Sequence, residues 1–196
     1  IEKINLGISY IKQIKSINIA KKKLYATNDF SKIKSCDVIV LCIPTPLSKK
    51  LKPDLSYLQK TIKSISPFVN SNQLISLEST SYPGTTVDEV VNKFKLKFNI
   101  GRNLFICYSP EREDPGNKEY KTIDVPKIIS GHTKNCLEVG KKFYGSVFKK
   151  LEPVSSTGAA EFTKLLENIY RSVNIGLINE MKIIADLMKL DIYEII

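Results

Sequence analysis

Four charged residues stand in a row in the segment SPEREDPGN, directly after the apolar run LFICY. They are Glu111, Arg112, Glu113 and Asp114. A chain that leaves a strand does not need four consecutive charges merely to turn, and the loop after a strand commonly holds the site of an α/β protein. A carboxylate placed there can transfer a proton, and its charged neighbours can bind a polar ligand. The alternative is a solvated loop without a function. The elements around this segment indicate which of the two interpretations holds.

Three apolar runs predict the strands of a buried sheet. VIVLCIP, QLISLEST and LFICYSP have the continuous apolar character of strands that are covered on both faces. Helical patterns lie between them, at Asp54 to Ser66 and at Val87 to Leu96. This alternation of strand and helix predicts a doubly wound, Rossmann-like parallel sheet in the α/β class.

The second half of the chain continues this pattern and then changes. KIISG is a further predicted strand, and a helix capped by Thr133 should run to Val147. After Pro153, one helical pattern of about 30 residues follows without a proline. A helix this long should leave the sheet domain and join the halves of a larger protein. The predicted boundary separates a domain at 1–152 from the start of a central, all-α dimerisation domain at 153–196.

The three predicted strand ends carry hydroxyls, prolines or carboxylates. They are Pro44-Thr45-Pro46, Glu78-Ser79-Thr80 and Ser109-Pro110-Glu111. In parallel α/β sheets, ligands bind beyond the carboxyl ends of the strands, which meet at one rim. A single such turn is most simply an ordinary connection in which Ser or Thr caps the next helix. Three of them at one rim favour a ligand cleft.

The long helix should offer a second polar surface to this rim. Lys164, Asn168 and Arg171 are spaced at i, i+4 and i+7, so they project from one face. Most such stripes are simply solvated. An ammonium and an amide on one face are, however, the usual partners of a developing oxyanion.

Composition excludes several other classes of function. The formal charge of +10 is built mainly from scattered lysines, with only three arginines, which does not favour nucleic-acid binding. Four separated cysteines and a single histidine give no metal cluster, and they indicate a reducing, cytoplasmic compartment. The sequence contains no signal peptide and no apolar run of about 18 residues, so no membrane role is expected.

Four motifs together resemble the UDP-glucose/GDP-mannose dehydrogenase family. They are CIPTPL, LESTSYPGTT, SPEREDPGN and EFTKLLENIYRSVNIGLINE, and they occur in the family's order. Within the family, the resemblance is strongest to bacterial UDP-N-acetylhexosamine dehydrogenases, particularly those that oxidise UDP-N-acetylglucosamine (UDP-GlcNAc). It implies a two-step oxidation of a sugar C6 alcohol to a carboxylate, with two NAD consumed and an enzyme-bound thioester between the steps. A homodimer through the central helix and a role in surface polysaccharide or O-antigen synthesis are implied as well.

The resemblance also implies roles for individual residues. Those expected to border NAD are Ile43, Pro44, Thr45, Ser79 and Thr80, with Thr80 near the reacting carbon. Glu111 matches the family's acid/base glutamate, which acts through water in thioester hydrolysis, and Lys164 and Asn168 match its oxyanion-stabilising pair. The remaining expected substrate contacts are Arg112, Glu113, Asp114 and Arg171.

The sequence departs from the family pattern at several points. A second loop glutamate, usual in UDP-glucose dehydrogenases, is replaced by Pro115, which favours the N-acetylhexosamine branch. The GxGxxG turn that holds a pyrophosphate does not occur, and none of the four cysteines lies in the glycine-rich context of the family's nucleophile. The chain is therefore expected to be a fragment that is inactive alone, with Lys3 placed near the adenosine ribose. The alternatives are a UDP-N-acetylmannosamine (UDP-ManNAc) or UDP-glucose dehydrogenase, or a catalytically inert binding or dimerisation module.

Overall fold

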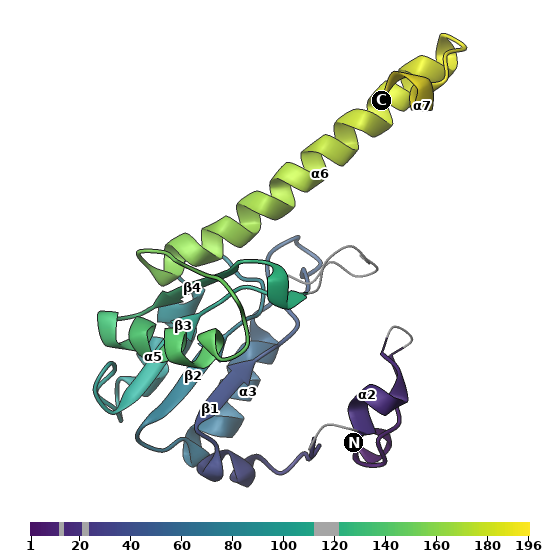
Figure 1. Cartoon of the computed structure of the whole chain (residues 1–196). Coiled ribbons are helices and arrows are strands. Elements are labelled where there is room, and N and C mark those ends of the chain that lie inside the picture. The colour runs from purple at the N-terminus through teal and green to yellow at the C-terminus, as the bar shows by residue number, and fades with distance from the viewer. Residues whose placement is uncertain (12–13, 21–23, 112–121) are drawn as a thin grey trace.

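A five-stranded sheet forms the centre of the computed structural model, which describes residues 1–11, 14–20, 24–111 and 122–196 (Figure 1). The strand order is β1-β2-β3-β4-β5. The strands are β1 (Val38–Leu41), β2 (Gln73–Leu77), β3 (Leu104–Tyr108), β4 (Lys127–Gly131) and β5 (Leu151–Pro153). The first three strands are adjacent and parallel, as predicted, and Leu41, Leu77 and Tyr108 are aligned at their carboxyl ends.

The fourth strand runs the other way. β4 pairs antiparallel to β3 through Cys107 with Gly131 and Tyr108 with Ser130, and β5 is parallel to β4. The parallel sheet predicted from the alternation of strands and helices is therefore a mixed sheet. An antiparallel neighbour needs no crossover helix.

Helices cover both faces of the sheet, because alternate strand residues point to opposite sides. On one face, Ile75, Leu77 and Ile106 pack in a core with α3 and with the helical segment that follows β2. On the other face, Leu74 and Cys107 pack against α5. The elements in these layers are α3 (Ser56–Ile65), the π-helical turn η3 (Thr86–Val91), α4 (Asn92–Phe94) and α5 (Lys134–Gly145).

The predicted helices form with small changes of boundary. α3 and α5 lie inside their predicted ranges, and the Thr133 side chain caps α5 by accepting the backbone N–H of Cys136 at 3.2 Å. The helix predicted at Val87 to Leu96 begins instead as the π-helical turn at Thr86. The smaller helical segments are α1 (Glu2–Asn5), α2 (Ser16–Ala20), η1 (Phe30–Ser35), η2 (Ser66–Phe68), η4 (Thr122–Asp124) and α7 (Ile192–Ile195).

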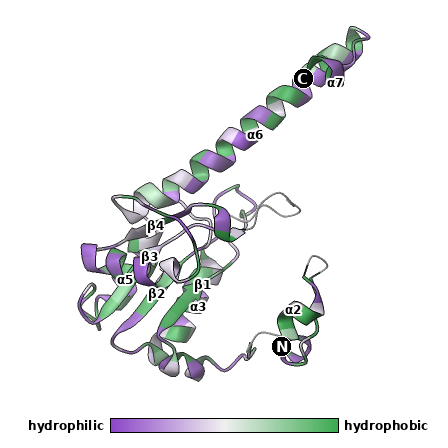
Figure 2. Cartoon of the chain, in the orientation of Figure 1, coloured by the Kyte–Doolittle hydropathy of each residue, from purple (hydrophilic) through white to green (hydrophobic). Residues whose placement is uncertain are grey.

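The long helix α6 (Thr157–Leu187) extends away from the sheet (Figure 1). Its N-cap is Ser156, whose hydroxyl accepts the N–H of Ala159 at 3.1 Å. Its first turns are buried against the sheet domain at Thr157, Ala160 and Glu161. Farther along, apolar side chains are exposed, and Figure 2 shows apolar bands over this projecting part. Among the helices that the structure describes, none is long and apolar enough to cross a membrane.

Candidate functional site

The ends of β1 and β2 are fastened to each other at the predicted rim. The backbone N–H of Ile43 donates to Ser79 Oγ at 2.7 Å, and the Ser79 hydroxyl donates to the Leu41 carbonyl at 3.2 Å. The Thr45 hydroxyl donates to the Thr80 carbonyl at 2.6 Å. The segments predicted to border a cofactor therefore lie together. Ser79 is buried and its hydroxyl holds the two loops in place, while Thr45 and Thr80 are half-exposed.

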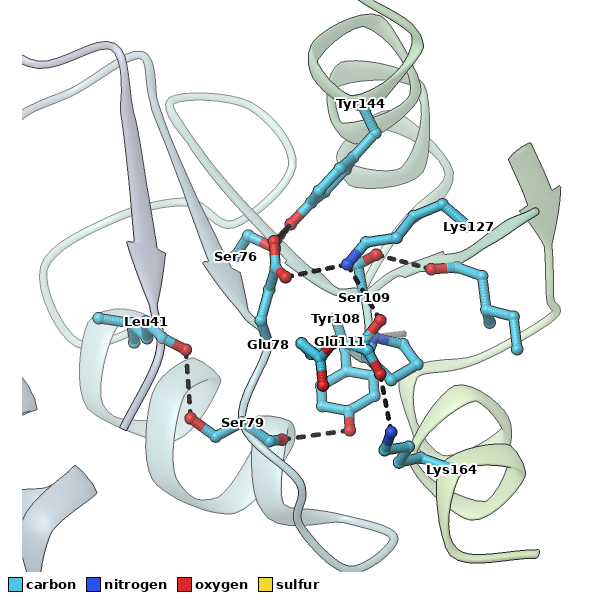
Figure 3. Close-up of polar contacts among 12 residues, drawn as sticks. Leu41, Ser76, Glu78, Ser79, Tyr108, Ser109, Glu111, Lys127, Tyr144 and Lys164 are labelled. Carbon is cyan, nitrogen blue, oxygen red and sulfur yellow. Dashed lines mark hydrogen bonds and ion pairs between the residues drawn. The ribbon is translucent and has the colours of Figure 1, made fainter. Parts of the chain in front are cut away.

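The end of β3 meets the long helix at the same rim. Lys164 Nζ donates to the backbone carbonyl of Glu111 at 2.8 Å (Figure 3). Asn168 is half-buried and follows one helical turn later, so its Cα lies roughly 6 Å farther along the helix axis. The structure thus brings together two segments that are 53 residues apart in the chain.

Other predicted site residues are not placed at this rim. Arg171 is exposed on the projecting part of α6. Lys3 is exposed on α1, in the N-terminal part of the chain that lies apart from the sheet in Figure 1. Arg112, Glu113 and Asp114 lie outside the described residues.

Glu161 fastens α6 to the loop that follows β2. Its side chain is 0% exposed. One carboxylate oxygen accepts the N–H of Gly84 at 2.7 Å, and the other accepts the N–H and the hydroxyl of Thr86 at 2.8 and 2.6 Å. Burial raises the pKa of the Glu161 carboxyl, although the Thr86 and Gly84 donors act against this. Gly84 has φ +103, where a side chain would be strained.

A second buried network lies beneath the rim (Figure 3). Lys127 Nζ donates to Glu78 Oε2 at 2.9 Å and to the Pro110 carbonyl at 3.0 Å. Glu78 Oε1 accepts the Tyr144 hydroxyl at 2.6 Å, and that hydroxyl lies 2.6 Å from Ser76 Oγ. Burial and the Glu78 charge raise the pKa of Tyr144, so the phenol stays protonated.

Sequence reasoning did not identify Lys127, Glu78, Tyr144 or Glu161 as site residues. Glu78 belongs to a strand end that was expected at the rim, and Glu161 lies one turn before Lys164 in the helix motif. The only indication for Lys127 in the sequence was weaker: it is a charged residue at the first position of a strand that is buried. Nothing in the local pattern pointed to Tyr144.

Cys42 and Cys107 are not activated thiols. Cys42, next to the rim, is exposed, but partial desolvation raises its pKa and the Glu78 charge raises it further. Burial raises the pKa of Cys107 to about 12. A nucleophilic cysteine normally has a lowered pKa, so neither Cys42 nor Cys107 has the character of a nucleophile.

The residues at the rim fit a nicotinamide cofactor. Ile43 and Pro44 give apolar surface beside the half-exposed Thr45 and Thr80, and Lys164 contacts the backbone of Glu111 beyond the end of β3. Directly after Thr80, Ser81 Oγ is buried and has no hydrogen-bond partner among the described residues. An apolar ring and an amide can both be accommodated by such a mixture of groups.

Comparisons with known proteins agree with this geometry. The model of the UDP-glucose/GDP-mannose dehydrogenase family, NAD binding domain, matches residues 1–148, and that of the same family's central domain matches residues 158–196. The chain belongs to this family. The NAD-binding domain of the UDP-glucose/GDP-mannose dehydrogenase family thus contains the whole β1–β4 rim, and the central domain contributes Lys164.

Individual relatives differ in the sugar named in their descriptions. A UDP-N-acetyl-D-glucosamine 6-dehydrogenase of Pseudomonas aeruginosa is 35% identical over 174 residues, covering 86% of this chain and 41% of the relative. Protein CapL of Staphylococcus aureus is 35% identical over 173 residues, covering 87% of this chain and 41% of the relative. The structure of a UDP-D-ManNAc dehydrogenase from Pyrococcus horikoshii matches with a TM-score of 0.89 at 31% identity, covering 100% of this chain and 48% of that one. The chain therefore spans less than half the length of these relatives.

Proposed function

We propose that the intact protein containing residues 1–196 oxidises the C6 hydroxyl of UDP-GlcNAc to the uronic acid with NAD. The observation that carries this proposal is the contact between Lys164 and Glu111 at a rim shared with Thr45 and Thr80. This contact supports the proposal because it joins the helix that carries Lys164 to the backbone of Glu111, beyond the end of β3. Pro115, in place of a second glutamate, favours the N-acetylhexosamine branch.

The complete reaction converts an alcohol, water and two NAD⁺ into a carboxylate, two NADH and three protons. When bound, NAD would supply the hydride acceptor for each oxidation. Lys164 and Asn168 hold the negative charge that develops on the sugar oxygen, because a fixed ammonium and an amide donor stabilise an oxyanion. In the hydrolysis of the thioester that the resemblance implies, water adds to the carbonyl carbon and the thiolate leaves. Glu111 takes a proton from that water as general base.

The remaining assignments follow from the same proposal. Ile43, Pro44, Thr45 and Thr80 border the nicotinamide, and Ser79 shapes this border through its bonds to both loops. Arg112, Glu113, Asp114 and Arg171 remain proposed substrate contacts, and Lys3 a proposed ribose contact. The proposed division into domains is 1–152 and 153–196.

The apolar surface of α6 supports a homodimer through this helix. Exposed apolar side chains follow one another along it, at Ile169, Val173, Leu177 and Ile184. A large uncovered apolar surface commonly marks an interface. The cytoplasm remains the proposed location, because all four cysteines are free thiols. The proposed role is the supply of UDP-uronic acid for surface polysaccharide or O-antigen.

The test is the rate of NADH formation by the intact protein with UDP-GlcNAc, UDP-ManNAc or UDP-glucose at the same NAD concentration. We expect the highest kcat/KM with UDP-GlcNAc. A higher value with UDP-ManNAc or UDP-glucose would assign the protein to that alternative. No NADH above the sugar-free control with any of the three would indicate an inert binding or dimerisation module.

A further inference from the structure

The Lys127 ammonium is almost completely enclosed beneath the rim. Its side chain is 3% exposed, against 15% for its partner Glu78. It lies 5.3 Å from the ring centroids of both Tyr144 and Phe148. A buried charge is costly unless it is paired and hydrogen-bonded. Such burial also keeps Lys127 out of contact with a substrate, so its effect must pass through the groups that it binds.

One of these groups is the backbone next to Glu111. Lys127 donates to the carbonyl of Pro110, which belongs to the peptide bond that joins Pro110 to Glu111. Because a peptide unit is planar, holding this oxygen restricts the orientation of the whole unit. Lys164 donates to the next carbonyl, that of Glu111 itself. Two lysines from different elements thus hold the carbonyl groups of Pro110 and Glu111, which lie on either side of the Glu111 Cα.

The position of the Lys127 ammonium is itself set by the sheet and α5. Glu78 accepts from Lys127 with one oxygen and from Tyr144 with the other. Tyr144 is also within hydrogen-bond distance of Ser76 on β2. Figure 3 shows this connection from Tyr144 through Glu78 and Lys127 to the segment that carries Glu111. The network therefore ties the Pro110 carbonyl, just beyond β3, to the end of β2 and to α5.

We propose that Lys127 is a positioning residue that sets the backbone of Glu111 for its work as general base, with Glu78 and Tyr144 holding its ammonium. This inference rests on the proposed role of Glu111. A positioning role predicts a specific kinetic result. Loss of Lys127 should reproduce the loss of the Glu111 carboxylate, because both slow the hydrolysis of the covalent intermediate and spare the preceding hydride transfer.

The experiment compares Lys127→Met with Glu111→Gln in the intact protein. Methionine keeps much of the length of the side chain and removes the ammonium. The measurements are the NADH burst, the steady-state rate, the KM for NAD and the covalent sugar adduct detected by mass spectrometry of the protein. We expect Lys127→Met to keep the burst, to accumulate the adduct and to lower the steady-state rate about 10- to 100-fold, as displacement of a catalytic group by about 1 Å does. The KM for NAD should stay within about twofold, in keeping with a loss confined to positioning.

Two further variants make the result specific. Lys149→Met is the matched control, because Lys149 is 71% exposed and pairs with Asp124 at the surface; it should behave as wild type. Tyr144→Phe removes only the hydroxyl that holds Glu78. It should give the same kinetic pattern, with a smaller fall in the steady-state rate than Lys127→Met. It serves as the test if Lys127→Met does not fold.

A double variant separates positioning from a general loss of structure. Added to Glu111→Gln, Lys127→Met should cause little further loss, because coupled groups are not additive. A wild-type steady-state rate for Lys127→Met, or a full additional loss in the double variant, would overturn the inference and leave the role of Glu111 intact. Wild-type hydrolysis by Glu111→Gln would overturn the proposed role of Glu111 and this inference together.

Discussion

Glu161→Gln tests how the central helix is fixed to the cofactor domain. The Glu161 carboxylate accepts three hydrogen bonds, two from Thr86 and one from Gly84, and it is fully buried. Glutamine has nearly the same shape but carries an NH₂ group in place of one oxygen. In either orientation of the amide, at least one buried backbone N–H faces another donor.

The expected cost follows from these contacts. A hydrogen bond to a charged group contributes about 1.5–3 kcal/mol, and the remaining bonds weaken when their acceptor becomes neutral. The loss is therefore about 2–4 kcal/mol in the free energy of opening the Gly84–Thr86 segment. Because every 1.4 kcal/mol is a factor of ten, the amides there should exchange hydrogen roughly 30- to 1,000-fold faster.

The assay is native-state hydrogen exchange followed by mass spectrometry on peptides that include Gly84 and Thr86. Glu180→Gln is the matched control, since Glu180 is exposed on the same helix, and it should leave exchange unchanged. Exchange in Glu161→Gln within about threefold of wild type would be too small for a lost buried hydrogen bond. That result would refute the reasoning that Glu161 fastens α6 to this loop.

Two further predictions concern Lys164 and the buried thiols. Lys164→Ala in the intact protein should lower kcat about 100- to 1,000-fold and leave the Kd for NAD nearly unchanged, with Lys182→Ala on the same helix as the control. A loss of about threefold or less would show that Lys164 contributes no oxyanion stabilisation. Cys107, whose pKa burial raises to about 12, should resist iodoacetamide at pH 8 while exposed Cys36 reacts, as peptide mass spectrometry can measure. Equal labelling of both in the folded protein would contradict the burial of Cys107.

The parallel part of the sheet could be predicted because its signals are local. The runs at β1, β2 and β3 are short, apolar and separated by helical periodicity, so both their type and their order follow from the chain. The direction of β4 could not be predicted in this way. KIISG has a strand composition, but no local pattern indicates its direction. It could be parallel to β3 after a crossover helix, or antiparallel beside β3, as the structure has it.

The same distinction applies to the site. Thr45, Thr80, Glu111 and Lys164 could be proposed because they follow strand ends or share a helix face, and the family motifs include them. Lys127 could not, because the two groups that it binds lie 49 and 17 residues away along the chain.

The distribution of buried and exposed residues along α6 shows a further limit of sequence patterns. Phe162, Leu166, Ile169 and Val173 keep the helical period, yet they are exposed, whereas Glu161 is fully buried. The period indicates which residues share a face. It does not indicate whether the sheet domain or another surface covers that face.

The most direct test of the proposed chemistry is the stoichiometry of the reaction catalysed by the intact protein. Limiting UDP-GlcNAc is incubated with excess NAD, NADH is measured by absorbance, and the sugar product is measured by mass spectrometry. We expect two NADH for each UDP-N-acetylhexosamine consumed and a carboxylate at C6. One NADH per sugar with an aldehyde or ketone product, or sugar turnover without NADH, would contradict it.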